Sequence, residues 1–394
     1  MTLQNIEEKL VGPNLPVSSV KLFRAVHNPE LFLGFANFGR CCGNVATATG
    51  STPEETKLKA IMEAYERSRS SEPPHGVIRA SANKLYGKRL AYLSIEDYAP
   101  LTDDQRSMNF LSTPNSDRKI SWVLGSRWNG EPVYVPLDLV CYNYNSRDRL
   151  YFANSSGVAA HTDATEAMKL ALAELIERDA LMRNWFEKET PRFLGDLSLS
   201  EKIKAREKYW MGEGRELVVS QLRSEYGTAI LATITGEEWP AFVSGAAARL
   251  DGNVEAAIEK AVEEAEANFE AYSSTNRFVL TRENCYSPDL HGLFYCDPDN
   301  FEHVKYLATP EAYDEAEVIA RDFHELMERL DAVIVWLTNP KDTFKVVRIL
   351  SKELVPISFG YNMGHYSHSV FAKEKGTEVL SRSEEELALP HYFP

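Results

Sequence analysis

The sequence predicts a mixed α/β protein, because two kinds of segment alternate along the chain. Short runs rich in β-branched and aromatic residues predict strands. Longer segments with apolar residues at helical spacing lie between these runs and predict helices. The predicted strands cover residues 31–38, 122–125, 133–140, 229–234, 332–337 and 345–350.

The clearest helices begin after turn or capping residues. Such residues accept hydrogen bonds from the free N–H groups of a first helical turn. The predicted helices follow Ser51, Thr52 and Pro53 over residues 54–69, Thr162 and Asp163 over residues 165–185, and Asn253 over residues 254–272. A fourth helix is predicted over residues 310–330.

The charge of the chain argues against several classes of partner. The 394 residues include 43 Lys and Arg against 58 Asp and Glu, which gives a net charge of −15. Negative charge repels nucleic-acid phosphates and anionic lipids, so we expect neither a nucleic acid nor a membrane as partner. No apolar run approaches the roughly 20 residues of a membrane helix. The first residues lack the pattern of a secretory signal, so we expect a cytoplasmic protein.

The five cysteines predict neither a disulfide framework nor a zinc site. Their number is odd, no CxxC pair occurs, and Cys41 and Cys42 are adjacent. We expect them to be small core residues in a reducing compartment.

One segment of the chain recurs after 111 residues. Residues 54–67 (EETKLKAIMEAYER) align with residues 165–178 (TEAMKLALAELIER) at five identical positions, three of them glutamates and one an arginine. A turn rich in Ser or Thr precedes both copies. We therefore expect two related halves that face each other across a pseudo-twofold axis.

Each of the two repeated helices carries a stripe of three glutamates. Spacings of eight and eleven residues place them on one helical face. On a solvated face, they would only form ordinary ion pairs with Arg67 and Arg178. The stripes consist of Glu55, Glu63 and Glu66 in the first helix and Glu166, Glu174 and Glu177 in the second.

A buried stripe favours another interpretation. The second helix is apolar around most of its circumference, which indicates burial. Buried carboxylates are costly without a cation, and only Arg67, Arg178 and Lys59 lie on the stripes. Mg²⁺ supplies the missing charge, because it takes oxygen ligands and carries substrate phosphates. We therefore predict a nucleotide site, although no GxxxxGK[ST] or GxGxxG loop is present.

Three other residues were weighed as site candidates. His365 and His368 have metal-ligand spacing only in a helix, whereas Gly360 and Gly364 predict a loop, so we expect no metal there. Arg348 lies on a predicted strand, where a phosphate contact and an ion pair at the strand edge both remain open.

Several segments of the sequence together resemble a known family. Residues 154–185, NSSGVAAHTDATEAMKLALAELIERDALMRNW, resemble the YcaO signature, in which a glycine-bearing loop precedes a glutamate helix that ends in ERDA and a tryptophan. STPEETKLKAIMEAYER resembles the family's other glutamate helix, and LHGLFYCDP, VVRILSKELVPISFG and PHYFP resemble later blocks. The resemblance covers about residues 40–394.

The resemblance implies a YcaO-type fold in which two glutamate helices face an ATP site. It implies a cyclodehydratase for ribosomal precursor peptides of the bacteriocin or microcin type. In that reaction Cys, Ser or Thr attacks the preceding carbonyl, ATP phosphorylates the amide oxygen, and phosphate leaves to give a thiazoline or oxazoline. The implied Mg²⁺ and ATP ligands are Glu63, Glu66, Glu166, Glu174 and Glu177, with Arg67 and Arg178 near the phosphates and Asn154 and Thr162 as further contacts.

The terminal segment Pro390–Pro394 aligns with the PxPxP tail of azoline-forming members, with Tyr392 in place of the middle proline. Such tails end near the active site, so the resemblance implies catalytic roles for Pro394 and Arg178. The alternative is a tail that only packs on the surface.

Two positions on or before the first helix also depart from the family pattern. Thr49 and Lys59 stand where many members have lysine and serine. Lys59 either supplies the missing cation or neutralises the stripe and weakens metal binding.

The family domain is expected over residues 41–394, with residues 1–40 as a segment packed on it. No separate module then remains to hold a leader peptide. The resemblance therefore implies a ThiF-like leader-binding partner and, as a further partner, a flavin-dependent azoline dehydrogenase; a homodimer stays open. Two other functions also stay open: a YcaO enzyme that forms a thioamide or an amidine, and a nucleotide-binding scaffold that has lost catalysis.

Overall fold

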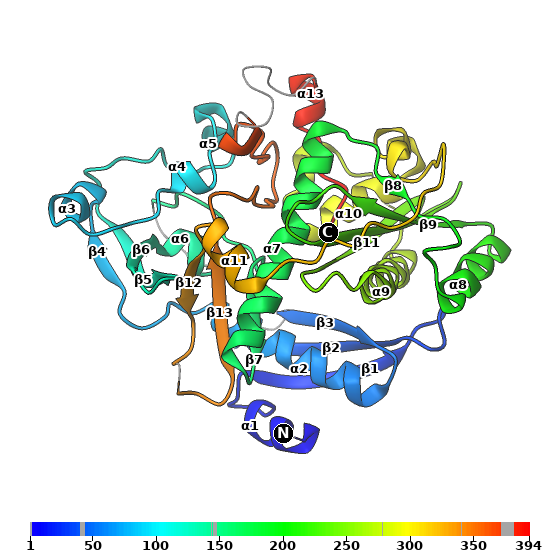
Figure 1. Cartoon of the computed structure of the whole chain (residues 1–394), viewed down its shortest axis with the longest axis horizontal. Coiled ribbons are helices and arrows are strands. Elements are labelled where there is room, and N and C mark those ends of the chain that lie inside the picture. Colours follow the sequence, from blue (N-terminus) through cyan, green and yellow to red (C-terminus); the bar gives the residue numbers. More distant parts are fainter. Residues whose placement is uncertain are drawn as a thin grey trace. The chain divides into compact units, whose positions relative to one another are not determined.

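The computed structural model describes residues 2–39, 44–142, 144, 148–277, 279–339, 341–371 and 382–394. Two compact units make up the chain. The first contains Met1–Leu175 and Met327–Leu354, and the second contains Ile176–Leu326 and Val355–Pro394. The mixed α/β class predicted from the sequence is confirmed (Figure 1).

The first unit contains a three-stranded antiparallel sheet with a helix packed on it. The strand order is β1-β2-β3, and helix α2 contacts all three strands. The Thr52 side chain caps α2 by accepting from the Glu55 N–H, and Pro53 occupies the first turn. The bounds are α1 Leu3–Leu10, β1 Val17–Arg24, β2 Phe32–Phe38, β3 Val45–Gly50 and α2 Pro53–Ser70.

A second sheet of the first unit is also antiparallel. Its order is β4-β5-β12-β13-β7, and β6 pairs with β5. The strands are β4 Ile78–Ala80, β5 Ile120–Arg127, β6 Pro132–Pro136, β7 Val158–His161, β12 Val333–Trp336 and β13 Lys345–Leu350. Short helices connect them: α3 Ala82–Gly87, α4 Ile95–Tyr98, α5 Asp103–Met108 and α6 Leu137–Val140.

The second unit is built on an antiparallel sheet of order β11-β10-β9-β8, against which helix α9 packs. The three longer strands are buried along nearly their whole length, which explains their continuous apolar runs. The strands are β8 Arg192–Phe193, β9 Glu216–Leu222, β10 Thr228–Thr235 and β11 Phe242–Arg249. The helices are α8 Glu201–Gly212, α9 Val254–Ser273, α10 Pro288–Cys296 and α13 Glu384–Leu387.

Helix α7, Ala164–Glu187, is shared by both units. The Asp163 carboxylate caps its start by accepting from the N–H groups of Thr165 and Glu166, at 2.8 and 3.0 Å. The boundary between the units falls between Leu175 and Ile176, inside the helix. Glu174 therefore belongs to the first unit and Glu177, three residues later, to the second.

The long helices are where the sequence predicted them, within two residues at each end. The predicted strand over residues 133–140 is half wrong, because β6 ends at Pro136 and helix α6 follows. The strand-to-helix repeat is present in both copies, as β3 with α2 and as β7 with α7. The pseudo-twofold axis and the boundary at residue 40 stay predictions, and Cys41 and Cys42 lie outside the described residues.

The predicted helix over residues 310–330 is wrong for most of its length. Only α11, Phe323–Arg329, is helical. Residues 310–322 instead run along the second unit's sheet, where Asp314 bridges Leu194 and the Gln221 side chain bonds both backbone groups of Glu317. These tertiary hydrogen bonds outweigh the helical propensity of the segment.

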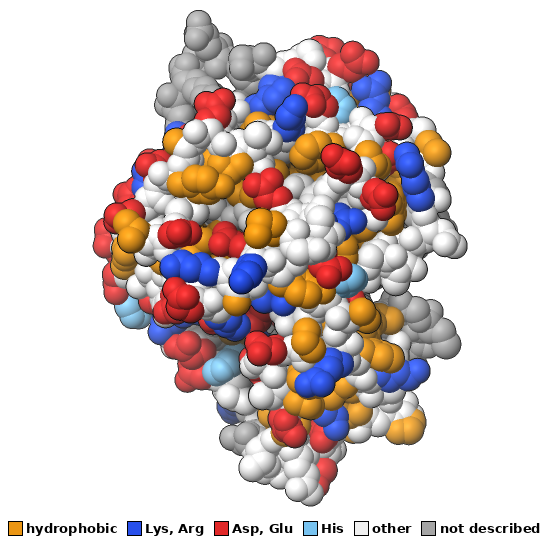
Figure 2. Space-filling view, turned by 90° about the vertical axis from the view of Figure 1, so that its right-hand side faces the viewer, with side chains coloured by type: hydrophobic (Ala, Val, Ile, Leu, Met, Phe, Trp, Pro, Cys, Tyr) orange, Lys and Arg blue, Asp and Glu red, His pale blue; other side chains and the backbone are white. Residues whose placement is uncertain are grey.

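The surface agrees with the acidic composition. On the face drawn in Figure 2, acidic and basic side chains are interspersed among apolar ones over the described residues. Within the described parts of the chain, no helix is long and apolar enough to cross a membrane.

Helix α9 approaches strand β11 so closely that only glycine fits at position 245. A Cβ there would lie 2.2 Å from the Ala265 nitrogen and 2.4 Å from the Ala261 oxygen. We expect Gly245→Ala to lower the free energy of unfolding in urea by at least about 3 kcal/mol. Gly212→Ala is the control, because a Cβ there meets nothing within 4 Å; it should change stability by less than about 1 kcal/mol. Equal stabilities of the two variants would contradict this packing.

Candidate functional site

Three predicted ligands of the first unit lie within electrostatic reach of one another. Glu63 and Glu66 are on α2 and Glu174 is on α7. Glu66 is only 8% exposed, and the Ala160 N–H of β7 donates to its carboxylate. The charges of Glu63 and Glu174 both act on Glu66, and we name Glu63, Glu66 and Glu174 the first carboxylate cluster.

The first carboxylate cluster has too little positive charge. Arg67 donates to Glu63 from Nε and Nη2, at 2.9 and 2.8 Å. Burial, with the charges of Glu63 and Glu174, raises the pKa of Glu66 well above its usual range, and Arg67 opposes this only in part. Within the described residues, the charge of Arg67 acts on all three carboxylates, and a further cation would stabilise their ionised forms.

The loop before β7 holds Glu174 from the other side. The Gly157 N–H donates to Glu174 Oε2 at 3.3 Å. Gly157 has a φ of +74°, and a Cβ there would lie 2.7 Å from the Leu175 side chain and from the Ile349 carbonyl oxygen. The glycine predicted in this loop is therefore required by its backbone conformation and by the closeness of helix α7.

Two other predicted residues, Asn154 in the same loop and Arg348 on β13, contact each other. The buried Arg348 of β13 donates from Nη1 to the Asn154 carbonyl oxygen at 2.6 Å. The Asn154 side chain accepts from the Ser156 N–H at 3.1 Å and so turns the loop. Of the two interpretations left open, the ion pair at a strand edge is wrong, because Arg348 is buried and bonds a carbonyl. Thr162 is exposed, and its carbonyl oxygen accepts from Lys345 Nζ at 3.1 Å.

The second unit contains a second pair of carboxylates, at the free edge of its sheet. Glu177 Oε2 accepts from the Ala248 N–H at 3.2 Å, and Glu264 Oε2 accepts from the Ala246 N–H at 2.9 Å. Both N–H groups belong to β11, which pairs only with β10 in the sheet of the described residues. We name Glu177 and Glu264 the second carboxylate cluster.

Two cations, Arg178 and Lys260, act on the second carboxylate cluster. Burial, with the charge of Glu177, raises the pKa of Glu264 to about 7, while Arg178 and Lys260 lower it. Arg178 Nη1 lies 3.1 Å from Glu177 Oε1, and its guanidinium carbon lies 4.4 Å from the centre of the Phe393 ring. The predicted residues Glu177 and Arg178 are thus in contact, with the terminal segment beside them.

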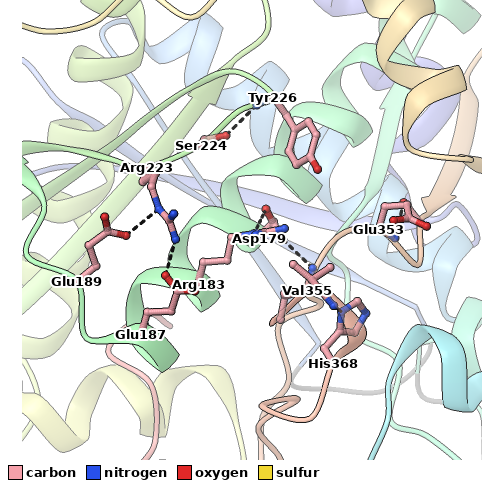
Figure 3. A network of polar contacts seen from close by, with 12 residues as sticks. Asp179, Arg183, Glu187, Glu189, Arg223, Ser224, Tyr226, Glu353, Val355 and His368 are labelled. Carbon is pink, nitrogen blue, oxygen red and sulfur yellow. Dashed lines mark hydrogen bonds and ion pairs between the residues drawn. The ribbon is translucent and has the colours of Figure 1, made fainter. Parts of the chain in front are cut away.

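Asp179 of the ERDA motif anchors this half of α7 (Figure 3). It is 1% exposed, accepts from the Val355 N–H at 2.7 Å and from Arg183 Nε at 2.8 Å. Near the end of the helix, Arg223 pairs with Glu187 and Glu189. Asp179 therefore fixes the turn that carries Glu177 and Arg178.

Other predicted residues lie elsewhere. Glu166 is exposed and pairs with Lys169 at 2.8 Å, and Leu170 is 50% exposed, so the expected burial of α7 is wrong for the face that carries these two residues. Lys59 pairs with Glu55 at 2.7 Å, which leaves Glu63 and Glu66 to Arg67. Lys59 therefore pairs with a stripe glutamate that is not a predicted ligand, and its effect on metal binding stays a prediction.

Two residues of the site were missed from the sequence. Glu264 lies in the acidic run EEAEANFE, which is typical of a solvated helix face. Asp179 is part of the ERDA motif, but no role was assigned to it. The only signal for Glu264 is its place on a helix next to a fully apolar strand pair.

The residues present fit Mg²⁺ when nucleotide phosphates complete its coordination. Among the described residues, no group of three or more His, Cys, Asp or Glu side chains can hold a metal ion alone; this includes the buried His365 and His368. Mg²⁺ usually binds one or two carboxylates and takes its other ligands from water and phosphates. Both carboxylate clusters offer that kind of donor.

Comparison with known proteins places the chain in a family. A family model described as YcaO cyclodehydratase, ATP- and Mg²⁺-binding, matches residues 47–355. The chain belongs to the YcaO family. ATP and Mg²⁺ are thus the cofactors of its family, as the sequence predicted. Comparison with curated proteins gives no significant match.

Solved YcaO-like structures share the fold. A heterocyclase in complex with substrate and cofactor has a TM-score of 0.77 at 17% identity, with 98% of this chain covered. This chain spans only 56% of that heterocyclase. YcaO from Methanopyrus kandleri, bound with AMPPCP and Mg²⁺, has a TM-score of 0.64 at 18% identity, with 86% of each chain covered. The E. coli microcin synthetase McbBCD complex with pro-MccB17 bound has a TM-score of 0.69 at 13% identity and covers 95% of this chain and 96% of that one.

The raised pKa of Glu264 predicts a pH-dependent stability. The folded state holds this proton more tightly than the unfolded state, so stability falls as pH rises from about 4.5 to about 7. Glu264→Gln keeps an acceptor for Ala246 but cannot ionise. In metal-free buffer, the stability of the variant relative to the wild type should rise by about 3 kcal/mol across this window and level off above it.

The measurement is urea unfolding at a series of pH values. Glu255→Gln, an exposed position on the same helix, is the control and should give a flat difference across this window. If the Glu264→Gln difference is also flat, the buried environment described for Glu264 is wrong.

Proposed function

We propose that the protein is an ATP-dependent cyclodehydratase that converts Cys, Ser or Thr of a ribosomal precursor peptide to thiazoline or oxazoline. The observation that carries this is the pair of carboxylate clusters, to which both helices of the family's signature contribute and α9 adds Glu264. Amide oxygen is a poor leaving group, and its phosphorylation by ATP makes its departure feasible. YcaO membership and the likeness to heterocyclases support the proposal.

The two clusters divide the work on Mg-ATP. In our proposal Glu63, Glu66 and Glu174 bind Mg²⁺, and Arg67 holds Glu63 in place and lies near the phosphates. Bound Mg²⁺ would neutralise phosphate charge and orient the terminal phosphoryl group. Arg348 and Asn154 act through the loop whose Gly157 N–H holds Glu174.

In our proposal the second carboxylate cluster, with Arg178, supplies a further metal ligand and a positive charge for the phosphoryl group. Glu177 acts as a further metal ligand, and Arg178 stabilises negative charge that develops on the transferred phosphoryl group. Pro394 takes part in the peptide reaction at the end of the terminal segment. Glu166 and Thr162, both exposed, remain proposed ligands that would turn toward the nucleotide when it binds.

The proposal includes partner proteins. The matched heterocyclase is longer, and this chain spans 56% of it. McbBCD is described as a complex that binds pro-MccB17. We therefore propose that a ThiF-like protein presents the leader of the precursor to this chain, and that a flavin-dependent dehydrogenase oxidises the azoline.

Removal of single carboxylates tests the nucleotide site. Calorimetry with Mg-ATP should show metal-dependent binding by the wild type, and Glu66→Gln or Glu177→Gln should weaken it at least about tenfold, because a ligand charge is lost. Glu55→Gln is the matched control on the same helix stripe, since Glu55 pairs with Lys59. Wild-type affinity in both ligand variants would place the nucleotide elsewhere.

Mass spectrometry of a co-expressed precursor tests the reaction. Each azoline should remove one water and one reactive Cys, Ser or Thr side chain. A mass gain from oxygen-to-sulfur exchange would instead indicate a thioamide, and a lost water with intact side chains, located by fragmentation, an amidine. ATP binding without any modification, with every partner present, would indicate a scaffold.

A further inference from the structure

The terminal segment Pro390–Pro394 is buried within the second unit. Tyr392 and Phe393 are each 1% exposed, and His391 is 5% exposed. Burial of two aromatic side chains and an imidazole fixes the segment in place, because any displacement would return their apolar surface to water.

Three successive residues of the segment each have a separate anchor. The Tyr295 hydroxyl donates to the Pro390 carbonyl oxygen, and His391 Nε2 lies 3.0 Å from the Ser358 carbonyl oxygen. The Ser244 hydroxyl donates to the Tyr392 carbonyl oxygen at 3.1 Å. The anchors thus come from α10, β11 and the loop at Ser358, which are far apart in the sequence.

Tyr392 is held by its side chain as well. Its hydroxyl donates to Asn184 Oδ1 at 3.2 Å. Its ring packs edge-on against Trp185 and Phe242, with ring centres 5.9 and 6.4 Å apart. A proline stiffens the backbone by fixing φ but offers neither contact. The tyrosine therefore immobilises the segment by a different physical means.

Phe393 then fixes the guanidinium of Arg178. Adjacent helical residues point in different directions, so Glu177 and Arg178 would not ordinarily face each other. Arg178 nonetheless reaches Glu177 at 3.1 Å, with its guanidinium carbon 4.4 Å from the centre of the Phe393 ring. The ring face attracts the cation and leaves it one side from which to meet the carboxylate.

We propose that Tyr392 and Phe393 are positioning residues: Tyr392 locks the terminal segment, and Phe393 holds the Arg178 guanidinium beside Glu177. The role of that guanidinium in Mg-ATP binding rests on the proposed function. The anchoring itself does not, so it is tested separately.

Hydrogen exchange of the amides of His391 and Phe393 tests the anchoring without nucleotide. Tyr392→Phe should speed exchange about fivefold through loss of one hydrogen bond. Tyr392→Pro should speed it at least as much, although it restores the family's residue. Wild-type protection in Tyr392→Pro would show that backbone stiffness suffices and would overturn the role of Tyr392.

A double-mutant cycle tests the contact between Phe393 and Arg178. Phe393→Leu and Arg178→Met should each speed exchange of the same amides about fivefold, and the double variant should be no faster than either, because both remove one contact. If the two single effects on the exchange rate multiply in the double variant, or if neither single variant changes the rate, the contact is overturned. Phe269→Leu is the matched control, since Phe269 packs under Arg215 in the same unit; it should leave these amides unchanged.

Mg-ATP calorimetry completes the test. Phe393→Leu should weaken binding about fivefold, whereas Phe269→Leu should not. Wild-type affinity in Phe393→Leu would overturn the positioning role. If the wild type itself fails to bind Mg-ATP, the proposed function fails, and the exchange measurements still decide the anchoring.

Discussion

Hydrogen bonds from backbone N–H groups to buried and half-buried carboxylates are the interaction on which the rest of this structure depends. A buried carboxylate without such donors would shed its charge or unfold its surroundings. Each donor also ties a side chain to a strand or loop that the sequence places far away, so the acid groups organise the fold around themselves. The pairs are Glu66 with Ala160, Glu174 with Gly157, Glu177 with Ala248, Glu264 with Ala246, and Asp179 with Val355.

The two glutamate helices and the charge on them could be predicted from the sequence. The two glutamate helices were found because their signals are local: capping residues at Thr52 and Asp163 and a repeated spacing of glutamates. The charge argument, that three cations accompany six glutamates on the stripes, also needs only the sequence. Burial of Glu66 and Glu177 agrees with it, although their roles as ligands remain proposals.

The errors have a common physical cause. Residues 310–322 were assigned to a helix because their partners, such as Gln221, are distant in sequence and no local pattern announces them. Glu264 was missed for the same reason, since only the fold brings it to β11. Lys59 shows the reverse case, in which a residue on the stripe finds a nearer partner in Glu55. Local periodicity locates elements, whereas long-range polar partners decide their surroundings.

The edge of β11 illustrates a further effect of these carboxylates. An edge strand with free N–H and C=O groups is a template for pairing with another chain, and most of β11 is apolar. Glu177, Glu264 and Asn268, whose amide donates to the Ser244 carbonyl oxygen at 2.8 Å, occupy these groups on alternate residues. Glu177, which is proposed to bind the metal, thus also occupies an edge group of β11, as Glu264 and Asn268 do, and replacing any of the three by alanine would leave that edge group open to pairing with another chain.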